Sequence, residues 1–415
     1  MKIGILCSEP VPVQKDIIGT GAGLRALQLG NHLSSWAEII YIVPEKKGIV
    51  YFFPGVHTYP EGQRGLEEYI PSVDILIAVQ WPVVNLLKEK PSVPLIIDFL
   101  SPLMLENQFL PTYHQKTFLS TKIEALRKAD LFFTSTPRQT AYFLPWLSLA
   151  GFNLADKDIV REVPLVFQDL SPVKFQKNKP LTFVHTGYFW PWQKTVPYLE
   201  ILADIAEKKG DSLVIYGGRH PYWTTFSGKY YDVSSLLERP NVTLKEPVPF
   251  SSLDEELGEN CIGVDLCAPN YERFLASPIK LSLYLAKKMP VLVSSVYAHS
   301  QTRWKKCGWS LYTAHIPSYK RLLRRIYPSI RRSYKAKSGK IFSEQKYMNK
   351  QVSVVLHEKE FKKIKQAPPQ NDAFFDFLPD YARLKFEYAE MENRVKSNGI
   401  FSQLKSAVKS LISKE

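Results

Sequence analysis

The sequence predicts an α/β protein with two doubly wound halves that face a central cleft. Three observations carry this prediction. Short apolar segments alternate with amphipathic helical ones, which is typical of parallel sheets with crossover helices. The alternation stops in a polar, lysine-containing stretch over residues 168–179 and then starts again. The chain has 415 residues, which is more than one ordinary domain holds.

Each half has its own series of expected strands. In the first half these cover residues 2–8, 39–43, 74–79 and 94–100, a segment ending near Ser135, and residues 161–167. In the second half they cover residues 181–187, 212–218, 241–246, 261–268 and 290–295. Because the carboxyl ends of parallel strands meet at one edge of a sheet, we expect ligands to bind along the two edges that face the cleft.

The composition indicates a globular protein kept in a reducing compartment. Hydrophobic residues make up 45% of the chain, and no run of them is long enough to span a membrane. The first eight residues are too short and too strand-like for a signal peptide. No C-x-x-C pair occurs, so we expect core thiols at Cys7, Cys261, Cys267 and Cys307. We therefore expect a cytoplasmic protein.

The net charge of +14 requires an anionic partner: nucleic acid, an anionic membrane face or phosphorylated substrates. Residues 320–350 hold eleven Lys or Arg against one acid, Glu344. Residues 399–414 follow an amphipathic pattern flanked by lysines, and such a helix lies in a membrane interface or packs on the protein. We expect peripheral attachment at the inner membrane face as one outcome. No nucleic-acid-binding signature accompanies the charge, so we expect no nucleic-acid partner.

The rest of the chain is organised around residues 274–295, which predict a helix that feeds a strand. Ser277 suits the N-cap and Pro278 the first helical position. The helix is expected to end at two lysines, just before a strand that starts at Pro290. The N–H groups of a helix N-terminus form an anion site. An ordinary helix-strand unit without a ligand explains the pattern equally well.

The same stretch resembles the donor-binding helix of retaining glycosyltransferases with the GT-B fold, of the family 4 type. The matching residues are Ser277, Pro278, Lys280, Tyr284, Ala286, Pro290 and Val291. The resemblance covers roughly residues 1–312 and is strongest at 181–295. It implies a GT-B fold of two Rossmann-like domains. It also implies that Ser277 and Lys280 lie at the diphosphate and ribose of a nucleotide-sugar donor.

The resemblance implies a domain organisation as well. Residues 1–168 would form the N-terminal acceptor-side domain, and residues 169–312 the nucleotide-sugar-binding domain. Residues 313–415 would then hold the basic segment, a return helix and the amphipathic tail. Because the GT-B fold usually ends with a helix that crosses back onto the first domain, we expect that helix at residues 381–394.

A glycine-rich segment over residues 19–23 has two interpretations. A dinucleotide fingerprint, with Glu45 on a ribose hydroxyl, requires its first glycine directly after a strand, but this segment starts eleven residues past the first strand. The resemblance instead implies that Gly21, Gly23 and Arg25 approach the donor diphosphate or the acceptor across the cleft. A flexible turn with a surface arginine is the structural alternative.

Three loops of the second half carry further candidates for donor binding. After its first strand, Gly187 permits close backbone approach and Lys194 could pair with phosphate. After the next strand, Gly218 frees the backbone and Arg219 is a bidentate phosphate donor. Val248 lies where the resemblance implies backbone contacts to the nucleobase. The alternative for the first loop is that its Trp-rich run packs on a neighbouring helix.

Two carboxylates near one strand end of the first half could orient an acceptor hydroxyl. Asp98 ends the strand and Glu106 follows in the next turn; we name Asp98 as the candidate catalytic residue. A retaining transfer can proceed without a protein base, because the leaving diphosphate can accept the proton. The histidines show no metal-ligand spacing such as H-E-x-x-H. The nucleotide-sugar is a substrate, so we expect neither metal nor cofactor.

The chain departs from the family at the two glutamates around the donor helix. Leu275 and Leu283 stand at those places, and a leucine accepts no hydrogen bond from a ribose. Glu272 lies three residues before the first and would substitute for it. The second has no obvious substitute, which leaves the donor and the activity open.

The sequence therefore predicts a glycosyltransferase that moves a sugar from a nucleotide-diphosphate donor to an acceptor hydroxyl, with retention of configuration. We expect a role in surface polysaccharide, glycolipid or glycoprotein assembly, with a glycan, lipid-linked or protein acceptor. One alternative is a catalytically inactive relative that binds or scaffolds other transferases. A nucleic-acid-binding protein is the other alternative.

Overall fold

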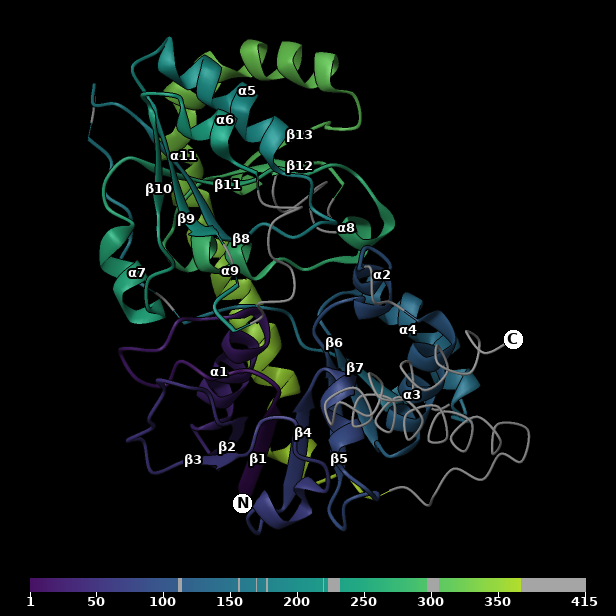
Figure 1. Ribbon diagram of the computed structural model, residues 1–415. Coiled ribbons are helices and arrows are strands. Elements are labelled where there is room, and N and C mark those ends of the chain that lie inside the picture. The colour runs from purple at the N-terminus through teal and green to yellow at the C-terminus, as the bar shows by residue number, and fades with distance from the viewer. Residues whose placement is uncertain are drawn as a thin grey trace, which may run out of the picture.

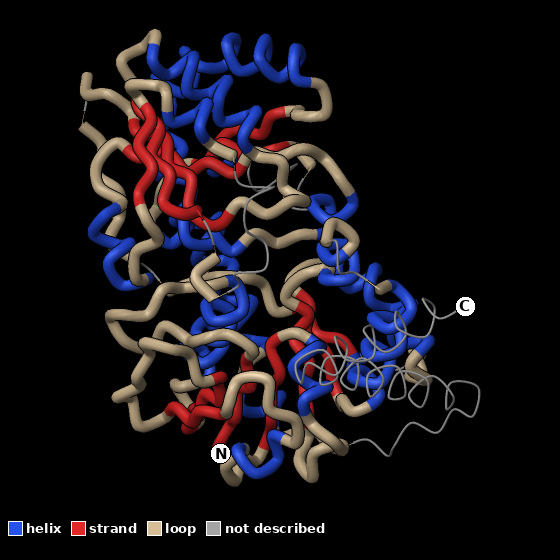
Figure 2. Tube along the Cα trace, viewed as in Figure 1, coloured by secondary structure: helices blue, strands red, loops and turns tan. Residues whose placement is uncertain are grey.

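The computed structural model describes residues 1–110, 114–155, 157–168, 170–176, 178–218, 220–222, 232–296 and 306–366. Two parallel sheets lie one above the other, and helices cover their faces (Figures 1 and 2). This arrangement confirms the predicted fold class. Arg219 and the helices expected at 381–394 and 399–414 lie outside the described residues.

The first half is built on a seven-stranded sheet in the order β3-β2-β1-β4-β5-β6-β7, with all neighbours parallel. The strands are β1 (Lys2–Cys7), β2 (Glu38–Pro44), β3 (Val56–Tyr59), β4 (Ile75–Val79), β5 (Leu95–Phe99), β6 (Leu131–Thr134) and β7 (Val160–Glu162). The helices are α1 (Gly21–Leu33), α2 (Leu103–Asn107), α3 (Gln115–Arg127) and α4 (Pro137–Leu149), with short 3-10 segments η1 (Leu66–Tyr69), η2 (Trp81–Leu86) and η3 (Lys157–Ile159).

The second half repeats the same winding on a six-stranded sheet in the order β10-β9-β8-β11-β12-β13. Its strands are β8 (Thr182–Tyr188), β9 (Ser212–Gly218), β10 (Val242–Lys245), β11 (Cys261–Asp265), β12 (Val291–Ser294) and β13 (Gly308–Leu311). Its helices are α5 (Val196–Glu207), α6 (Ser234–Leu237), α7 (Phe250–Glu256), α8 (Tyr271–Leu275) and α9 (Ile279–Ala286). In both sheets the strand order reverses beside the first strand, and ligands bind outside the carboxyl ends at such a point.

Continuous apolar runs explain why the central strands lie inside. β4 and β5 are buried along their whole length, as expected for parallel strands covered on both faces. One hydrophobic cluster joins residues of β1, α1, α9 and β12 and therefore spans both halves. Each sheet also has a cluster of its own on its other face. The two halves thus share a core, which fixes their carboxyl edges opposite each other.

The basic segment forms one long helix, α11 (Ile316–Val355), followed by the short α12 (Glu358–Phe361). α11 begins on the second half and runs down behind both halves (Figure 1). At its lower end the Trp36 Nε1–H donates to the Leu356 carbonyl at 2.9 Å, and Phe361 packs edge-on against Trp36. The return to the first half is thus made by α11 and α12. The domain boundaries at residues 168 and 312 stay predictions.

α9 begins later than the sequence predicts. Its first residue is Ile279, and Pro278 occupies the N-cap position with extended ψ of 124° and no side-chain hydrogen bond. The expectation that Ser277 is the N-cap is therefore wrong. The Pro278 carbonyl accepts a hydrogen bond from the Leu281 N–H at 3.1 Å, so the helix starts after the proline. Ser277 therefore lies outside the helix and lines the cavity.

Tyr284 anchors α9 to the sheet beneath it. Its hydroxyl accepts the Thr186 N–H at 2.9 Å and lies 3.1 Å from the Val184 carbonyl. The ring also covers Gly263, where a Cβ would come within 2.3 Å of it. The four cysteines are buried thiols outside any disulfide, as predicted. None of the helices in the described part of the chain is both long and apolar enough to cross a membrane.

Candidate active site

A cavity of about 430 Å³ lies between the carboxyl edges of the two sheets. Residues of both halves line it, from the loops after β1, β4 and β5 on one side and after β8, β9 and β11 on the other. The loop before α1 reaches across: Ile18 bridges Pro249, and the Tyr188 hydroxyl donates to the Gly19 carbonyl at 3.2 Å. A volume of this size suits a small molecule of nucleotide or sugar dimensions.

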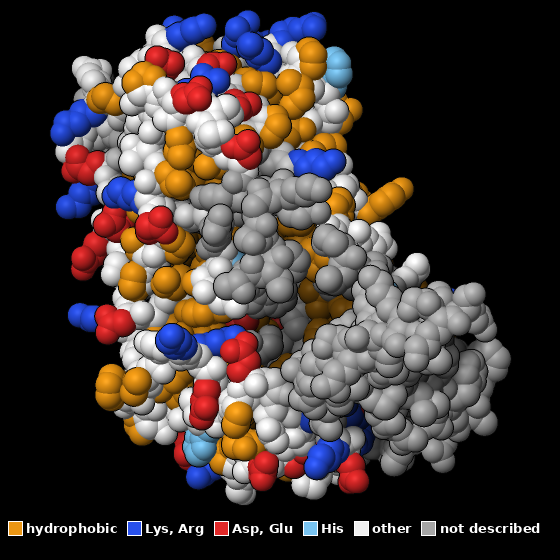
Figure 3. All heavy atoms as spheres, in the orientation of Figure 1, with side chains coloured by type: hydrophobic (Ala, Val, Ile, Leu, Met, Phe, Trp, Pro, Cys, Tyr) orange, Lys and Arg blue, Asp and Glu red, His pale blue; other side chains and the backbone are white. Residues whose placement is uncertain are grey.

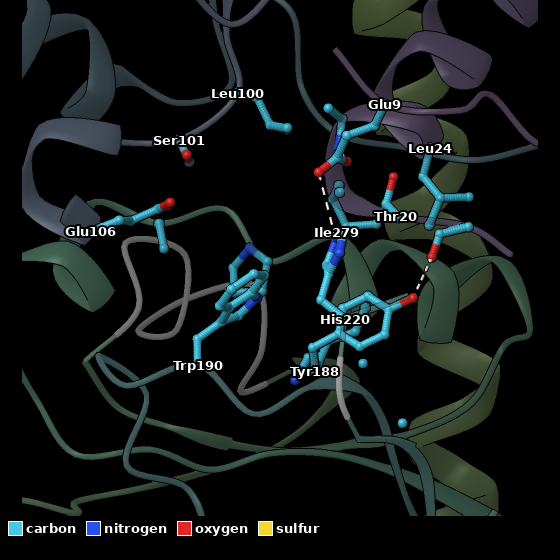
Figure 4. A pocket seen from close by; sticks show the side chains of 18 of the residues that line it. Glu9, Thr20, Leu24, Leu100, Ser101, Glu106, Tyr188, Trp190, His220 and Ile279 are labelled. Atoms are coloured by element: carbon cyan, nitrogen blue, oxygen red, sulfur yellow. Dashed lines mark hydrogen bonds and ion pairs between the residues drawn. The ribbon is translucent and has the colours of Figure 1, made fainter. Parts of the chain in front are cut away.

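Figure 4 shows that the cavity is elongated. Ser101 and Glu106 lie toward one end, with Trp190 facing them from the second half. Thr20 and Leu24 lie toward the other end, across from Tyr188 and His220. The first end is polar and aromatic. The second end continues into an apolar wall that includes Val248, Phe250, Leu253, Ile279 and Leu283.

The start of α9 carries the cationic group of the second wall. The Lys280 Nζ lies 3.3 Å from the Asp265 Oδ1 and 3.4 Å from the His185 Nε2, and the side chain lines the cavity. Burial lowers the pKa of Lys280, and Asp265 opposes this effect. Gly187 lies beside it: an added Cβ would stand 3.8 Å from the Lys280 Nζ, and its φ of 106° favours glycine.

This wall has the chemistry of an anion site. The N–H groups of Ile279 and Lys280 lie in the first turn of α9, where a helix offers no intrahelical partner. The positive end of the helix dipole and the Lys280 ammonium act at the same place. Ser277 and Gly187 line the cavity beside them. A diphosphate is a ligand that such a wall would hold.

The opposite helix N-terminus, that of α1, is already occupied. The Glu9 carboxylate accepts the Ala22 N–H at 3.2 Å, and the Thr20 hydroxyl accepts the Gly23 N–H at 3.4 Å. A Cβ at Gly23 would strike the Pro10 carbonyl at 2.0 Å, so this glycine serves packing. Gly21 lines the cavity and Gly23 does not. The anion site of α1 is thus filled by the chain's own carboxylate.

Arg25 and Asp98 pair with each other beneath the cavity floor. Both side chains are fully buried, and the Arg25 Nη2 lies 2.7 Å from the Asp98 Oδ1. The remaining guanidinium bonds go to Gln28 and to the carbonyls of Val163 and Pro164. Neither residue lines the cavity. The pair ties α1 to β5 and to the segment that follows β7.

The remaining candidate residues also fall into two groups, those that line the cavity and those that do not. Those that line the cavity, besides Gly21, Gly187, Ser277 and Lys280, are Val248 and Glu272. Lys194 is exposed and does not line it, and Gly218 lies just outside it with a φ of 133°. At the family's glutamate positions, Leu283 lines the cavity and belongs to the core shared by both halves, while Leu275 does not line it.

Two carboxylates from opposite halves meet at the polar end. Glu106 of α2 hydrogen-bonds Glu272 of α8, and Glu272 pairs with Arg273. Burial and the nearby Glu272 raise the pKa of Glu106 to about 8. Burial also raises the pKa of Glu272, against the effect of Arg273. The pair therefore retains a proton near neutral pH, which makes it a hydrogen-bond donor as well as an acceptor.

Several lining residues have no motif that sequence reasoning could detect. Glu9 follows β1 in an irregular proline-rich loop, and its Oε1 lies 3.5 Å from the His220 Nε2. Burial raises the pKa of Glu9 and lowers that of His220 to about 4. Gln80 and Gln193 also line the cavity. The only sequence signal for these residues is their position in a loop that follows a predicted strand.

Comparisons with known proteins support the fold. No protein-family model and no curated protein sequence matches the chain. A solved sucrose-phosphate synthase from Thermosynechococcus elongatus is similar to it with a TM-score of 0.60 and 13% identity, covering 87% of this chain and 98% of that one. A structure described as trehalose-6-phosphate from E. coli bound with UDP-2-fluoro glucose gives a TM-score of 0.58 and 11% identity, over 89% and 100%.

A third solved structure, an alpha-glucosyltransferase in complex with UDP-glucose and DNA containing an abasic site, has a TM-score of 0.56 and 14% identity. It covers 88% of this chain and 99% of that one. Each of the three matches covers at least 87% of this chain and at least 98% of the other one. Together with the two parallel sheets and the cavity between them, these likenesses show that the chain has the GT-B fold.

Proposed function

We propose that the protein is a glycosyltransferase that uses a nucleotide-diphosphate sugar. The observation that carries the proposal is the anion site at the start of α9, which faces the cavity from the second half of a GT-B fold. Of the solved structures similar to this one, several hold UDP or a UDP-sugar, as their descriptions state. The apolar end of the cavity offers room for a nucleoside, and the space beside the start of α9, between the two ends, offers room for the transferred sugar.

The chemistry follows from this placement. The bond between the anomeric carbon and the diphosphate oxygen breaks, and a bond from that carbon to the acceptor oxygen forms. The hydroxyl proton passes to the leaving diphosphate, so the balance needs no protein base. Lys280 and the first N–H groups of α9 stabilise the charge that grows on the leaving group. Retention of configuration requires attack from the face that the diphosphate leaves.

The acceptor pathway and the membrane are part of the same proposal. We infer a role in assembling surface polysaccharide, glycolipid or glycoprotein. α11 exposes Arg321, Arg324, Arg325, Arg332, Lys335, Lys340, Lys346 and Lys350. Figure 3 shows Lys and Arg side chains over the top of the second half, where Figure 1 places the start of α11. Anionic lipid would attract such a helix, and the attraction would weaken with salt.

The rival is a relative without activity that binds or scaffolds other transferases. Leu283 motivates it, because this side chain is 4% exposed and packed in the shared core, where the family has a ribose ligand. In that case the cavity could still bind a nucleotide without transferring a sugar.

Release of nucleotide from UDP-, GDP- and dTDP-sugars tests the proposal. We expect slow hydrolysis of one donor by the full chain, and none by the Lys280→Gln variant. Product analysis by NMR should then show the anomeric configuration of the donor. Nucleotide binding without any release, across the whole panel of donors and acceptors, would favour the scaffolding rival.

A further inference from the structure

The polar end of the cavity holds three buried polar atoms that have no hydrogen-bond partner among the described residues. They are the Gln80 Oε1, the Trp192 Nε1 and the Gln193 Oε1. All three side chains line the cavity and are more than nine-tenths buried. A buried polar group without a partner costs free energy of folding. Three of them at one end of the cavity, contributed by both halves, indicate a ligand with hydroxyl groups.

The local structure fixes where these atoms lie. The Gln80 Nε2 donates to the Ser101 Oγ at 2.7 Å, which leaves the Gln80 Oε1 as the free acceptor. The backbone of Gln80 has a φ of 72°, an unfavourable conformation for a side-chain-bearing residue. Such strain persists where the surrounding structure holds it, and it is frequent at functional sites. On the facing wall, the Gln193 N–H donates to the Trp190 carbonyl at 3.0 Å.

Two tryptophans complete this end. Trp190 and Trp192 stack with ring centroids 4.9 Å apart and an interplanar angle of 8°. Asn270 holds their loop, because its Nδ2 donates to the Trp192 carbonyl at 2.6 Å. The C–H face of a pyranose is apolar and its rim is polar, so it fits an aromatic plate surrounded by amide groups. A lipid chain would cover the plate and leave the amide atoms without partners.

We propose that Gln80, Ser101, Trp190, Trp192 and Gln193 form an aromatic–amide pocket that binds the sugar ring of the acceptor, so that the acceptor is a carbohydrate. This inference rests on the proposed function and names its second substrate. The phosphate-binding groups of the donor belong to the second half. Gln80 and Ser101 come from the first half, on the far side of the transferred sugar. Glu106 lies at the same end, as Figure 4 shows, within reach of acceptor hydroxyls.

The experiment compares sugar transfer with donor hydrolysis in one enzyme preparation. With the accepted donor, nucleotide release is measured in buffer alone and with a panel of methyl glycosides and disaccharides. Polyprenyl phosphate, a Ser/Thr peptide and an oligonucleotide are run beside them. We expect at least one sugar to raise release above the hydrolysis rate and to appear in the product. A panel in which only a non-sugar acceptor does so, or in which nothing does, overturns the carbohydrate assignment.

Variants then test the pocket itself. Trp190→Ala should raise the acceptor KM about tenfold more than it changes donor hydrolysis, and Trp190→Phe should recover most of the loss. Gln80→Gly should act in the same direction, because glycine accepts a φ of 72° without strain. Tyr271→Ala is the matched control, since this aromatic residue is 82% exposed near the pocket and does not line it.

The outcomes separate this inference from the function on which it rests. If Trp190→Ala lowers donor hydrolysis as much as transfer, the pocket holds the donor's sugar and the acceptor assignment is wrong. If nucleotides bind and donors hydrolyse but no sugar is accepted, the carbohydrate inference fails and the proposed function stands. If the wild type neither binds a nucleoside diphosphate nor hydrolyses any donor, the proposed function fails first.

Discussion

Arg25 is a fully buried cation and Lys280 a half-buried one, and each lies beside a glycine-containing loop, one in each half of the molecule. Arg25 uses all five of its N–H donors on the protein: two go to Asp98 and the other three go to Gln28 and two carbonyls. Lys280 has two polar neighbours, Asp265 and His185, at 3.3 and 3.4 Å. Only Lys280 lines the cavity.

The difference teaches how to separate a structural cation from a ligand-binding one. A guanidinium with every donor occupied has nothing left for a phosphate, and it holds elements together instead. An ammonium with long contacts and a free donor beside helix N–H groups is poised for an anion. The variants below test this distinction, starting with the largest expected effect.

Arg25→Ala should destabilise the protein by about 3–5 kcal/mol, because it leaves Asp98 buried without its partner. Urea unfolding followed by circular dichroism measures the change. The double variant Arg25→Met, Asp98→Leu should recover part of the stability, since it removes both charges. If the Arg25→Ala protein unfolds at the same urea concentration as the wild type, Arg25 is not the structural cation that the comparison requires.

Lys280→Gln should weaken binding of a nucleoside diphosphate by about 1.5–3 kcal/mol, the usual effect of losing a hydrogen bond to a charged group. Titration calorimetry measures the affinity. Asp265→Asn is the matched variant, since it keeps Lys280 and removes its competing carboxylate. We expect Asp265→Asn to bind as tightly as the wild type or more tightly. Equal affinity in wild type and Lys280→Gln would remove Lys280 from the site.

Glu106→Gln extends the comparison to a half-buried acid. The folded pKa of Glu106, about 8, lies above that of the unfolded chain, so the folded state binds the extra proton. The contribution of this group to stability is therefore full below about pH 4.5 and is lost as the pH rises toward 8. One pKa unit corresponds to about 1.4 kcal/mol, and water in the cavity reduces the effect.

For Glu106→Gln we thus expect a stability gain over the wild type of about 1–2 kcal/mol at pH 8, shrinking toward pH 5. Urea unfolding at both pH values measures it. The same gain at both would show that the side-chain proton is not involved.

Lys122 is a buried cation that has no acidic partner among the described residues. Its Nζ has no hydrogen-bond partner among the described residues and lies 3.8 Å from the ring centre of Trp146. Burial lowers the pKa of Lys122 well below its usual value, so the unfolded chain binds the extra proton. Stability should therefore rise with pH toward about 10.

Lys122→Met should stabilise the protein at pH 7 by about 1 kcal/mol, because methionine fills the same space without a charge. The gain should shrink as the pH approaches 10, where the lysine is neutral in both states. Thermal unfolding across this range measures the effect. A loss of stability at pH 7 would show that the contact with Trp146 outweighs the desolvation.

Much of the fold could be predicted from the sequence, because parallel strands need apolar runs and helices show their period. The α9–β12 unit was predicted in this way, while Lys280 was named only because the stretch resembles a donor-binding helix. The buried pairing of Arg25 with Asp98 could not be predicted, because 73 positions separate the two residues and no local pattern shows that they meet. Within the described residues α11 and α12 return to the first half, and they were not predicted because their basic surface hid the buried face that includes Tyr319, Leu323 and Ile341. The helix expected at residues 381–394 stays a prediction.

The central claim is that the cavity between the two halves binds a nucleoside diphosphate at the start of α9. Thermal unfolding of the full chain with UDP, GDP and dTDP tests it most directly. A ligand at about one hundred times its Kd stabilises the folded state by about 2.7 kcal/mol. We predict that one of the three raises the Tm of the wild type by a few degrees and that Lys280→Gln loses most of this rise. An unchanged Tm of the wild type with all three nucleotides at millimolar concentration would contradict the claim.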